Sequence, residues 1–285
     1  MQTFPSVTKA EWLAKVTKDL RGKPLEELDF TVGEKTLSPF HHAEDLRCPP
    51  APLKSEPGWQ IGAHIGVQDV TKANKRALAA LKGGAQFLWF SRYSPMDAAQ
   101  KKVLLNGIHL EMIDHYVDEH EINRGRGKPA LDLYHASLQA DVSPVFYVWP
   151  PTENFFETVA LLRAIRLCWQ LVREQTNGSV KCTIRVFLPR REKEPNMNHI
   201  VNAVSATAAV IGGADVLFIP SAADHKEEND FYRRIAGNIH HLLIEEARLG
   251  KVADPAAGSY YIETLTDHYA SNLWAEFQAL HAKDQ

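Results

Sequence analysis

Residues 183–220 read TIRVFLPRREKEPNMNHIVNAVSATAAVIGGADVLFIP, and this stretch sets the class of fold. Two short runs rich in β-branched and aromatic residues, Thr183–Leu188 and Val216–Pro220, enclose a segment at about 197–212 whose apolar residues recur with a spacing near 3.6. A strand, a helix and a second strand in this order predict parallel strands joined by a crossover helix. The stretch therefore indicates an α/β fold built on a parallel sheet.

The same alternation extends in both directions along the chain. The strand candidates are Gln60–Val67, Gln86–Ser91, Ile108–Ile113, Ala130–Ser137, Val145–Trp149, Thr183–Leu188, Val216–Pro220 and Ser259–Glu263. The helical candidates lie at about 71–82, 96–104, 154–175, 197–212, 227–248 and 264–281. Eight strand candidates predict a (β/α)8 TIM-type barrel, shortened or degenerate because the third and fourth connections are too short or too polar for full helices. The alternative is an open doubly wound sheet, but no G-x-G-x-x-G motif follows a strand candidate.

The segment before the barrel has a different composition. Residues Lys9–Leu20 predict a polar helix, and short extended pieces follow it up to Ser38-Pro39-Phe40. Residues 48–57 read CPPAPLKSEP, a proline-rich composition that favours extended backbone and marks a linker or arm. We therefore expect an N-terminal arm and linker at residues 1–58 and the barrel domain at residues 59–285.

The bulk composition excludes several classes of protein. Of the 285 residues 45% are apolar and 24% are charged, as in an ordinary globular protein, and 32 Lys and Arg against 35 Asp and Glu give a net charge of −3. This balance argues against a nucleic acid as partner. The apolar runs fall far short of the roughly 20 residues that cross a bilayer, and the first residues lack a signal-peptide pattern, so we expect a cytoplasmic protein without a membrane segment. Three widely spaced cysteines predict neither a disulfide framework nor a zinc site.

Several long motifs, in order along the chain, resemble the methylmalonyl-CoA mutase family. Residues 254–266 read DPAAGSYYIETLT, which is similar to the end of the family's substrate barrel. Residues 154–169, NFFETVALLRAIRLCW, resemble its F-F-x-E-x-A-x-L-R-A-x-R-x-L-W helix, and residues 38–46 and 59–62 resemble the start of its smaller subunit. The resemblance implies a (β/α)8 barrel whose centre admits the pantetheine arm of an acyl-CoA, joined to a separate cobalamin-binding domain.

The resemblance also implies a chemistry. Enzymes of that family interconvert succinyl-CoA and methylmalonyl-CoA through a radical derived from adenosylcobalamin, which does the difficult step. We expect this chain to lack the cobalamin-binding domain, because its nearest approach to the D-x-H-x-x-G motif is Asp118-Glu-His120-Glu-Ile-Asn123, with Asn in place of Gly. The chain alone is therefore expected to bind no cofactor, and adenosylcobalamin is expected in the complex that it joins.

Two further segments depart from the family's pattern. Where the family has R-x-H-x-Q-T-S-G-x-S-L-T, residues 184–195 read IRVFLPRREKEP. Arg185 matches the arginine of this motif. Apolar or charged residues replace the side chains that would donate hydrogen bonds to the thioester and CoA. The family's tyrosine-bearing R-G-x-Y-x-T-M-Y and R-Q-Y-A-G segments are also replaced. Gly62 stands where an arginine would face the substrate, and His64 is the one polar residue in the stretch Ile61–Gly66 that replaces them.

The candidate functional residues follow from these comparisons. His64 and Arg185 are the candidate catalytic residues, and the candidates for binding a cofactor or CoA phosphates are Arg185, Arg190, Arg191 and Asn198. The run from Arg190 to Glu194 is otherwise expected to be a solvent-facing loop. No metal site is predicted, because the His and acidic residues at 41–45 would point to opposite sides of an extended chain.

Large aromatic residues lie in or near the strand candidates. We expect them to fill the barrel interior and to obstruct the channel for an acyl-CoA; they are Trp89, Tyr93, Tyr134, Tyr147 and Trp149. The junction at residues 254–266 is expected to be structural, with Gly258 allowing a tight reversal and Glu263 or Thr264 opening the final helix.

Together these observations predict a non-catalytic barrel subunit that stabilises a catalytic mutase chain in a heterodimer. One alternative is an acyl-CoA mutase barrel that acts with adenosylcobalamin bound on a separate subunit, with a ligand pocket formed by His64, Arg185 and Asn198. Another is an acyl-CoA binding module without turnover. A homodimer through the mutase-type interface is the alternative assembly where the partner is absent. The sequence leaves open whether the chain is itself an enzyme.

Overall fold

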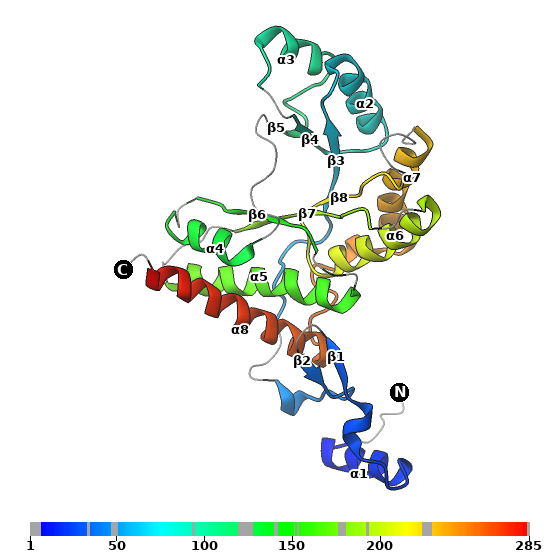
Figure 1. Ribbon diagram of the computed structural model, residues 1–285, viewed down its shortest axis with the longest axis vertical. Coiled ribbons are helices and arrows are strands. Elements are labelled where there is room, and N and C mark those ends of the chain that lie inside the picture. The colour runs from blue at the N-terminus through cyan, green and yellow to red at the C-terminus, as the bar shows by residue number, and fades with distance from the viewer. Residues whose placement is uncertain are drawn as a thin grey trace.

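A six-stranded parallel sheet forms the centre of the structure (Figure 1). The computed structural model describes residues 7–32, 35–46, 51–92, 95–118, 128–139, 142–150, 152, 154–175, 181–191, 194–223 and 230–283. The strands of the sheet are β3 (Gln60–Gly66), β4 (Phe87–Ser91), β5 (Asp114–Asp118), β6 (Val145–Val148), β7 (Thr183–Phe187) and β8 (Val216–Phe218).

The strand order, β5-β4-β3-β8-β7-β6, is that of a barrel with two strands fewer. The first strand of the sheet, β3, pairs with the last, β8, with Gln60 opposite Val216, as the first and last strands of a closed barrel do. The sheet curls into a half-barrel, and within the described residues β5 and β6 remain its two edges. An eight-stranded barrel would need two more strands between these edges, so the expected shortened TIM-type barrel is confirmed.

The two edge strands are protected against pairing with other chains. Pro144 and Pro150 flank β6, and neither can donate a hydrogen bond to a neighbouring strand. The other edge strand, β5, begins with the exposed and polar Asp114 and His115. Proline and polar side chains at an open edge disfavour aggregation.

Helices cover the outer face of the sheet (Figure 1). Their bounds are α2 (Val70–Lys82), α3 (Ala98–Leu104), α4 (Pro129–Ser137), α5 (Phe155–Gln175), α6 (Pro195–Ile211), α7 (Asp230–His241) and α8 (Tyr260–Lys283). The long helices α5 and α8 pack against each other, α4 packs on α8, and α6 packs on α5. A π-helical turn (Leu242–Glu246) continues α7, and a 3-10 turn (Leu249–Lys251) follows. No helix within the described ranges has the length and apolar character needed to cross a bilayer.

The largest apolar cluster lies between the sheet and these helices. Ile184, Val186 and Leu217 point outward from β7 and β8 and are fully buried against residues of α5 and α8. A second cluster joins β3 and β4 to α2 and α3. Burying one face of the sheet in this way uses every second strand residue, which leaves the alternate residues for the inner face.

An N-terminal arm precedes the half-barrel and extends beyond its helices (Figure 1). It contains α1 (Lys9–Asp19) and the antiparallel strands β1 (Phe30–Val32) and β2 (Lys35–Leu37). A capping box between Thr8 and Glu11 stabilises the start of α1. Two 3-10 turns, Leu25–Leu28 and Ala43–Asp45, complete it. The hairpin is not isolated, since Val32 and Leu37 pack against residues of α5 and α8.

Five of the eight predicted strands are present, and three predictions are wrong. Residues Ala130–Ser137 form a helix, because Pro129 occupies its first turn and Ala130, Leu133 and Tyr134 are buried at helical spacing. Residues Ser259–Glu263 also start a helix, so α8 begins at Tyr260 and not at Glu263 or Thr264. The third, Ile108–Ile113, is irregular, and the strand begins only at Asp114.

Candidate functional site

The inner face of the half-barrel is the side turned away from the outer helices. An aromatic cluster occupies it, built from alternate residues of β4, β6, β7 and β8 and the residue after β6: Phe87, Trp89, Tyr147, Trp149, Phe187, Val216 and Phe218. We call this set the inner aromatic cluster. In a closed barrel the same face would surround the central axis, where the resemblance predicts the pantetheine arm.

Stacked and edge-on rings hold the inner aromatic cluster together. Phe187 stacks on Phe218 with ring centroids 4.2 Å apart, and Trp149 stacks on Phe187 at 5.0 Å. Trp89 meets Phe187 and Tyr147 edge-on at 5.3 and 5.4 Å. The separations of 5.0 to 5.4 Å are those that aromatic pairs favour, and the stacked Phe187 and Phe218 rings are slightly closer. Trp89, Tyr147 and Trp149 therefore lie on the inner face as expected, whereas Tyr134 lies on α4 and Tyr93 is outside the described residues.

Gly62 makes room for this packing. A Cβ atom at Gly62 would lie 2.6 Å from the ring of Phe218 and 2.9 Å from the carbonyl oxygen of Leu217. Both distances are shorter than van der Waals contact, so no larger side chain fits while Phe218 keeps its place. At the position where the family's arginine was expected to face substrate, the space is taken by a phenylalanine ring.

Arg185 lies on the inner face but is turned onto aromatic rings. Its guanidinium carbon is 4.4 Å from the centroid of Phe87, and Nη1 donates to the hydroxyl of Tyr147 at 3.3 Å. A cation above a ring is attracted by the negative face of the π system. The Nε of Arg185 has no hydrogen-bond partner among the described residues.

The strand register separates His64 from Arg185. Arg185 is level with Val216 on β8, and Val216 is level with Gln60 on β3. His64 lies four residues beyond Gln60, which is about 13 Å further along the strand direction at the usual rise per residue. The exposed His64 is 2.8 Å from the hydroxyl of Ser91 through Nε2. The structure therefore does not bring the two candidate catalytic residues together.

The other candidates bind backbone carbonyls after the strands. Arg190 donates to Ala223 O at 2.8 Å, and Arg191 donates to Thr152 O at 2.8 Å. Asn198 is fully buried at the start of α6, where its Nδ2 donates to Ala222 O at 3.0 Å. These three side chains thus tie together the loops after β6, β7 and β8. The backbone amide of Arg191 also donates a hydrogen bond to Asn198 Oδ1 at 3.3 Å.

The sequence interpretation missed a buried ionic cluster that explains the 254–266 junction. Arg163 of α5 is 1% exposed; it forms an ion pair with Asp254 and a second, at 2.7 Å, with Glu263. Asp254 also accepts from the Leu53 amide at 2.9 Å, and Glu263 from the Gly258 amide at 3.0 Å. We call these three charged residues the Arg163 clamp. Its signal in the sequence is the presence of arginines in an otherwise apolar helix.

A second ionic cluster joins the proline-rich segment to the sheet. Lys54 and Arg166 are 8% and 9% exposed, and both bind Asp215, at 3.4 and 2.8 Å. Lys54 also donates to Gly58 O and Ala214 O at 2.6 and 2.8 Å. Burial is the largest influence on the pKa of Lys54 and lowers it, while Asp215 acts in the opposite direction. The cluster holds the proline-rich segment at the amino ends of the strands.

A buried histidine lies beside this segment. His240 of α7 is 1% exposed, and its Nδ1 accepts a hydrogen bond from Trp59 Nε1 at 3.1 Å. Burial lowers the pKa of His240 to about 4, so the ring is neutral at pH 7.

Among the described residues no three His, Cys, Asp or Glu side chains are grouped to hold a metal ion. The Asp118–Asn123 motif falls on residues that the structure does not describe beyond the backbone of Asp118.

Comparison with known proteins identifies relatives for most of the chain. The family profile described as Methylmalonyl-CoA mutase matches residues 134–283, which is more than half of the chain. The methylmalonyl-CoA mutase small subunit of Porphyromonas gingivalis is 33% identical, over 96% of this chain and 63% of its own length. The small subunit of Propionibacterium freudenreichii subsp. shermanii is 36% identical over 45% of this chain and 21% of its own length, and the probable small subunit of Mycobacterium bovis 34% over 46% and 23%.

Two facts about coverage follow. The chain spans less than two thirds of the length of these relatives. The alignment with the Porphyromonas gingivalis subunit runs over 391 positions, more than the 285 residues of this chain, so that relative carries internal segments without a counterpart here. Internal segments of this kind agree with the finding that the described residues form a sheet of six strands, where a full barrel has eight.

Proposed function

Because the chain belongs to the methylmalonyl-CoA mutase family, we propose that it is a non-catalytic barrel subunit that stabilises a catalytic mutase chain. The observation that carries this proposal is the inner aromatic cluster, closed at Gly62 by the ring of Phe218. A pantetheine arm needs an open passage and polar groups to bind its amides and thioester. Stacked rings with almost fully buried faces supply neither.

The adenosylcobalamin of the complex belongs, in this proposal, to the catalytic partner. When bound, that cofactor supplies the radical chemistry of the family. The inner face described here does not fit it, because its most buried groups are hydrocarbon rings and its arginine is engaged with Phe87 and Tyr147. The names of the relatives, small subunits of a mutase, support a role beside a larger chain.

A heterodimer with a barrel-containing partner would have to bury enough surface to be stable. Stable interfaces bury about 1,200–2,000 Å² in total, a large area for a 32.0 kDa chain. The chain would then contribute surface and rigidity, and the partner would contribute the substrate-binding groups. A homodimer is the alternative assembly of the same surfaces.

The test combines assembly with ligand binding. The chain, its candidate catalytic partner and their mixture are compared by size exclusion with light scattering, and each is titrated with succinyl-CoA and free CoA in a calorimeter. We expect a heterodimer in the mixture, a longer-lived activity of the partner, and no acyl-dependent heat from the chain alone. Succinyl-CoA binding to the isolated chain that is tighter than CoA binding and is lost in Arg185→Gln would overturn the proposal.

One observation favours a second function, an acyl-CoA mutase barrel with adenosylcobalamin on another subunit. Arg185 is on the inner face and has an unpaired Nε among the described residues, which a substrate carboxylate would satisfy. This function requires rearrangement of succinyl-CoA when adenosylcobalamin and a corrin-binding chain are added, and its loss in Arg185→Gln and His64→Gln variants that remain folded. Binding without any turnover under these conditions would instead identify an acyl-CoA binding module.

A further inference from the structure

Helix α6 presents an uncharged and partly apolar face to solvent. Its 17 residues, Pro195–Ile211, contain no Lys, Arg, Asp or Glu. By contrast, the outer helices α2 and α3 expose lysines, among them Lys72 and Lys102. Three apolar side chains of α6 are about half exposed: Met197 at 48%, Ile200 at 58% and Val204 at 47%. A solvated helix carries polar and charged residues on its outer face, so an outer face of this kind is suited to being covered.

The exposed residues follow the spacing of a coiled-coil seam. Met197, Ile200 and Val204 are separated by three and then four residues, and Thr207 and Ile211 continue this alternation. The hydroxyl of Thr207 donates to Ala203 O at 2.8 Å, so its methyl group remains for packing. The stripe that faces the half-barrel is a different set, at most 1% exposed: Asn198, Asn202, Ala206 and Ala209. α6 therefore has a second stripe suited to a helix, on its side away from the sheet.

The start of α7 widens this face. α7 packs beside α6 (Figure 1), and Tyr232 stacks on His199 with ring centroids 5.7 Å apart. This contact brings the start of α7, including the 52% exposed Phe231, beside the first half of α6. Arg234 lies at the margin, with its guanidinium carbon 5.9 Å from the centroid of the Phe231 ring. We call four apolar residues the α6 surface: Met197, Ile200, Val204 and Phe231.

The positions within the seam suit pairing with an identical helix. In an antiparallel pair related by a two-fold axis, Ile200 on the axis meets Ile200 of the second copy, and Met197 meets Val204 of the second copy. This match arises because Met197 lies three residues before Ile200 and Val204 lies four residues after it. The antiparallel arrangement also places opposite ends of the two helix dipoles side by side.

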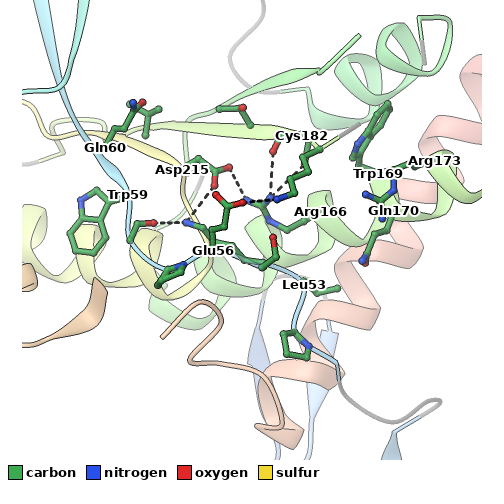
Figure 2. A pocket seen from close by; sticks show the side chains of 18 of the residues that line it. Leu53, Glu56, Trp59, Gln60, Arg166, Trp169, Gln170, Arg173, Cys182 and Asp215 are labelled. Carbon is green, nitrogen blue, oxygen red and sulfur yellow. Dashed lines mark hydrogen bonds and ion pairs between the residues drawn. The ribbon is translucent and has the colours of Figure 1, made fainter. Parts of the chain in front are cut away.

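The lack of charge on α6 favours a second copy over a different helix. Unlike helices usually select each other through complementary charges beside the seam. α6 offers none, whereas elsewhere in the chain a buried charge is compensated, as Figure 2 shows for Arg166 and Asp215, whose ion pair measures 2.8 Å. Two uncharged α6 faces leave no buried charge without a counter-charge when they meet.

We propose that two copies of this chain associate through the α6 surface, with their α6 helices antiparallel across a two-fold axis at Ile200. Met197 is flexible enough to fill the gaps of such a contact. A seam of two heptads is short, so we expect a weak dimer with a dissociation constant of about 1–100 µM. The proposal does not rest on the proposed function, because the inner aromatic cluster contains no residue of α6 and lies on the other face of the sheet.

Sedimentation velocity of the whole chain, over concentrations that bracket this dissociation constant, measures the association. The mass should rise from 32.0 kDa towards twice that value. Ile200→Glu places two like charges at the axis and should raise the dissociation constant at least about tenfold. Because Ile200 is 58% exposed, this variant should keep its fold, which far-UV circular dichroism checks. The matched control is Val103→Glu on α3, which changes a 43% exposed apolar residue and should leave the association unchanged.

A mixture of two variants tests the two-fold axis itself. Ile200→Lys alone should be as weakly associated as Ile200→Glu. Mixing the two variants brings one ammonium opposite one carboxylate, so the dimer should return. A seam that pairs with an unlike helix would give no such rescue.

Four outcomes overturn the proposal. The first three are a wild type that stays monomeric over this range, equal effects of Ile200→Glu and Val103→Glu, and a mixture of the two Ile200 variants that stays monomeric. The fourth is a heterodimer with the candidate catalytic chain that Ile200→Glu weakens while the chain alone does not self-associate. That result would assign the α6 surface to the catalytic chain and would leave the proposed function in place.

Discussion

Replacing the buried Arg163 by methionine should lower the free energy of unfolding far more than replacing any exposed charged residue. The guanidinium is 1% exposed and holds two carboxylates, Asp254 and Glu263, whose side chains are 4% and 14% exposed. Removing one partner of a buried ion pair leaves an uncompensated charge and costs about 3–5 kcal/mol. Here each carboxylate keeps one backbone amide, from Leu53 and from Gly258, so we expect the lower part of that range.

The expected loss of about 3–4 kcal/mol converts to a fall in Tm of about 6–16 °C, at about 2–4 °C per kcal/mol for a chain of this size. Urea unfolding followed by far-UV circular dichroism measures the free energy, and a thermal scan measures Tm. The control is Lys15→Met on α1, whose pair with Asp19 has side chains 69% and 61% exposed. It should change stability by no more than about 0.5 kcal/mol.

A further variant separates charge from packing. Arg163→Met combined with Asp254→Asn and Glu263→Gln has no uncompensated buried charge, so it should recover part of the lost stability. The reasoning about the Arg163 clamp is refuted if Arg163→Met loses less than 1 kcal/mol, or if the triple variant is less stable than the single one.

Three other predictions follow from the described contacts. Gly62→Ala should lower the free energy of unfolding in urea by about 1–3 kcal/mol, because the added methyl group meets the ring of Phe218. Adding Phe218→Leu should recover part of this loss. If the effects of the two changes simply add, this explanation is contradicted. His240 has a pKa of about 4 in the folded protein and 6.5 in the unfolded chain, so the folded state loses stability as pH falls below 6.5. Between pH 7 and 5 the free energy of unfolding should fall by about 2 kcal/mol more in the wild type than in His240→Asn. Equal pH dependence of the two proteins would contradict this prediction. Burial raises the pKa of Cys168 to about 12 and of Cys182 to about 11, so both thiols should resist a maleimide in the native protein at pH 7.5 and react in urea, as mass spectrometry of peptides will report.

The parts of the fold that the sequence predicted well are those with a clear period. The unit at residues 183–220 contains β7, α6 and β8 as expected, because apolar β-branched runs and a helical apolar period are both strong signals there. β3, β4 and β6 were predicted for the same reason, as were α2 and α5, and the arm helix α1 was predicted as a polar helix. Local pattern is sufficient where tertiary structure agrees with it.

The wrong predictions come from places where tertiary contacts override β propensity. Tyr260, Tyr261 and Ile262 favour strands, yet they form the first turn of α8, which brings Glu263 to Arg163 and buries Ile262. The edge strand β5 was missed because its sequence, DHYVD, is polar and reads as a loop. An edge strand buries little, so its sequence carries little apolar signal.

The candidate site was only partly accessible to sequence reasoning. The aromatic residues of the strands could be identified, and alternation placed them on one face, but the fit between Gly62 and Phe218 depends on register across two strand pairs. The pairing of Lys54 with Asp215 joins residues far apart along the chain, and a single sequence holds no signal for it. The arginines at 190 and 191 were taken as candidates for anion binding, whereas described donors on both bind carbonyl oxygens.

The pairing of β3 with β8 also has a consequence for how the protein is made. Gln60 pairs with Val216, which is synthesised roughly 150 residues later, so the middle of the sheet cannot form before then. At the usual pace of synthesis, about 5–20 residues per second, the amino-terminal strands spend on the order of ten to thirty seconds on the ribosome without their neighbour. During that interval the aromatic side chains of β4 are exposed to other molecules. Nascent chains stalled before residue 216 should therefore recruit chaperones, and chains stalled well beyond it should release them.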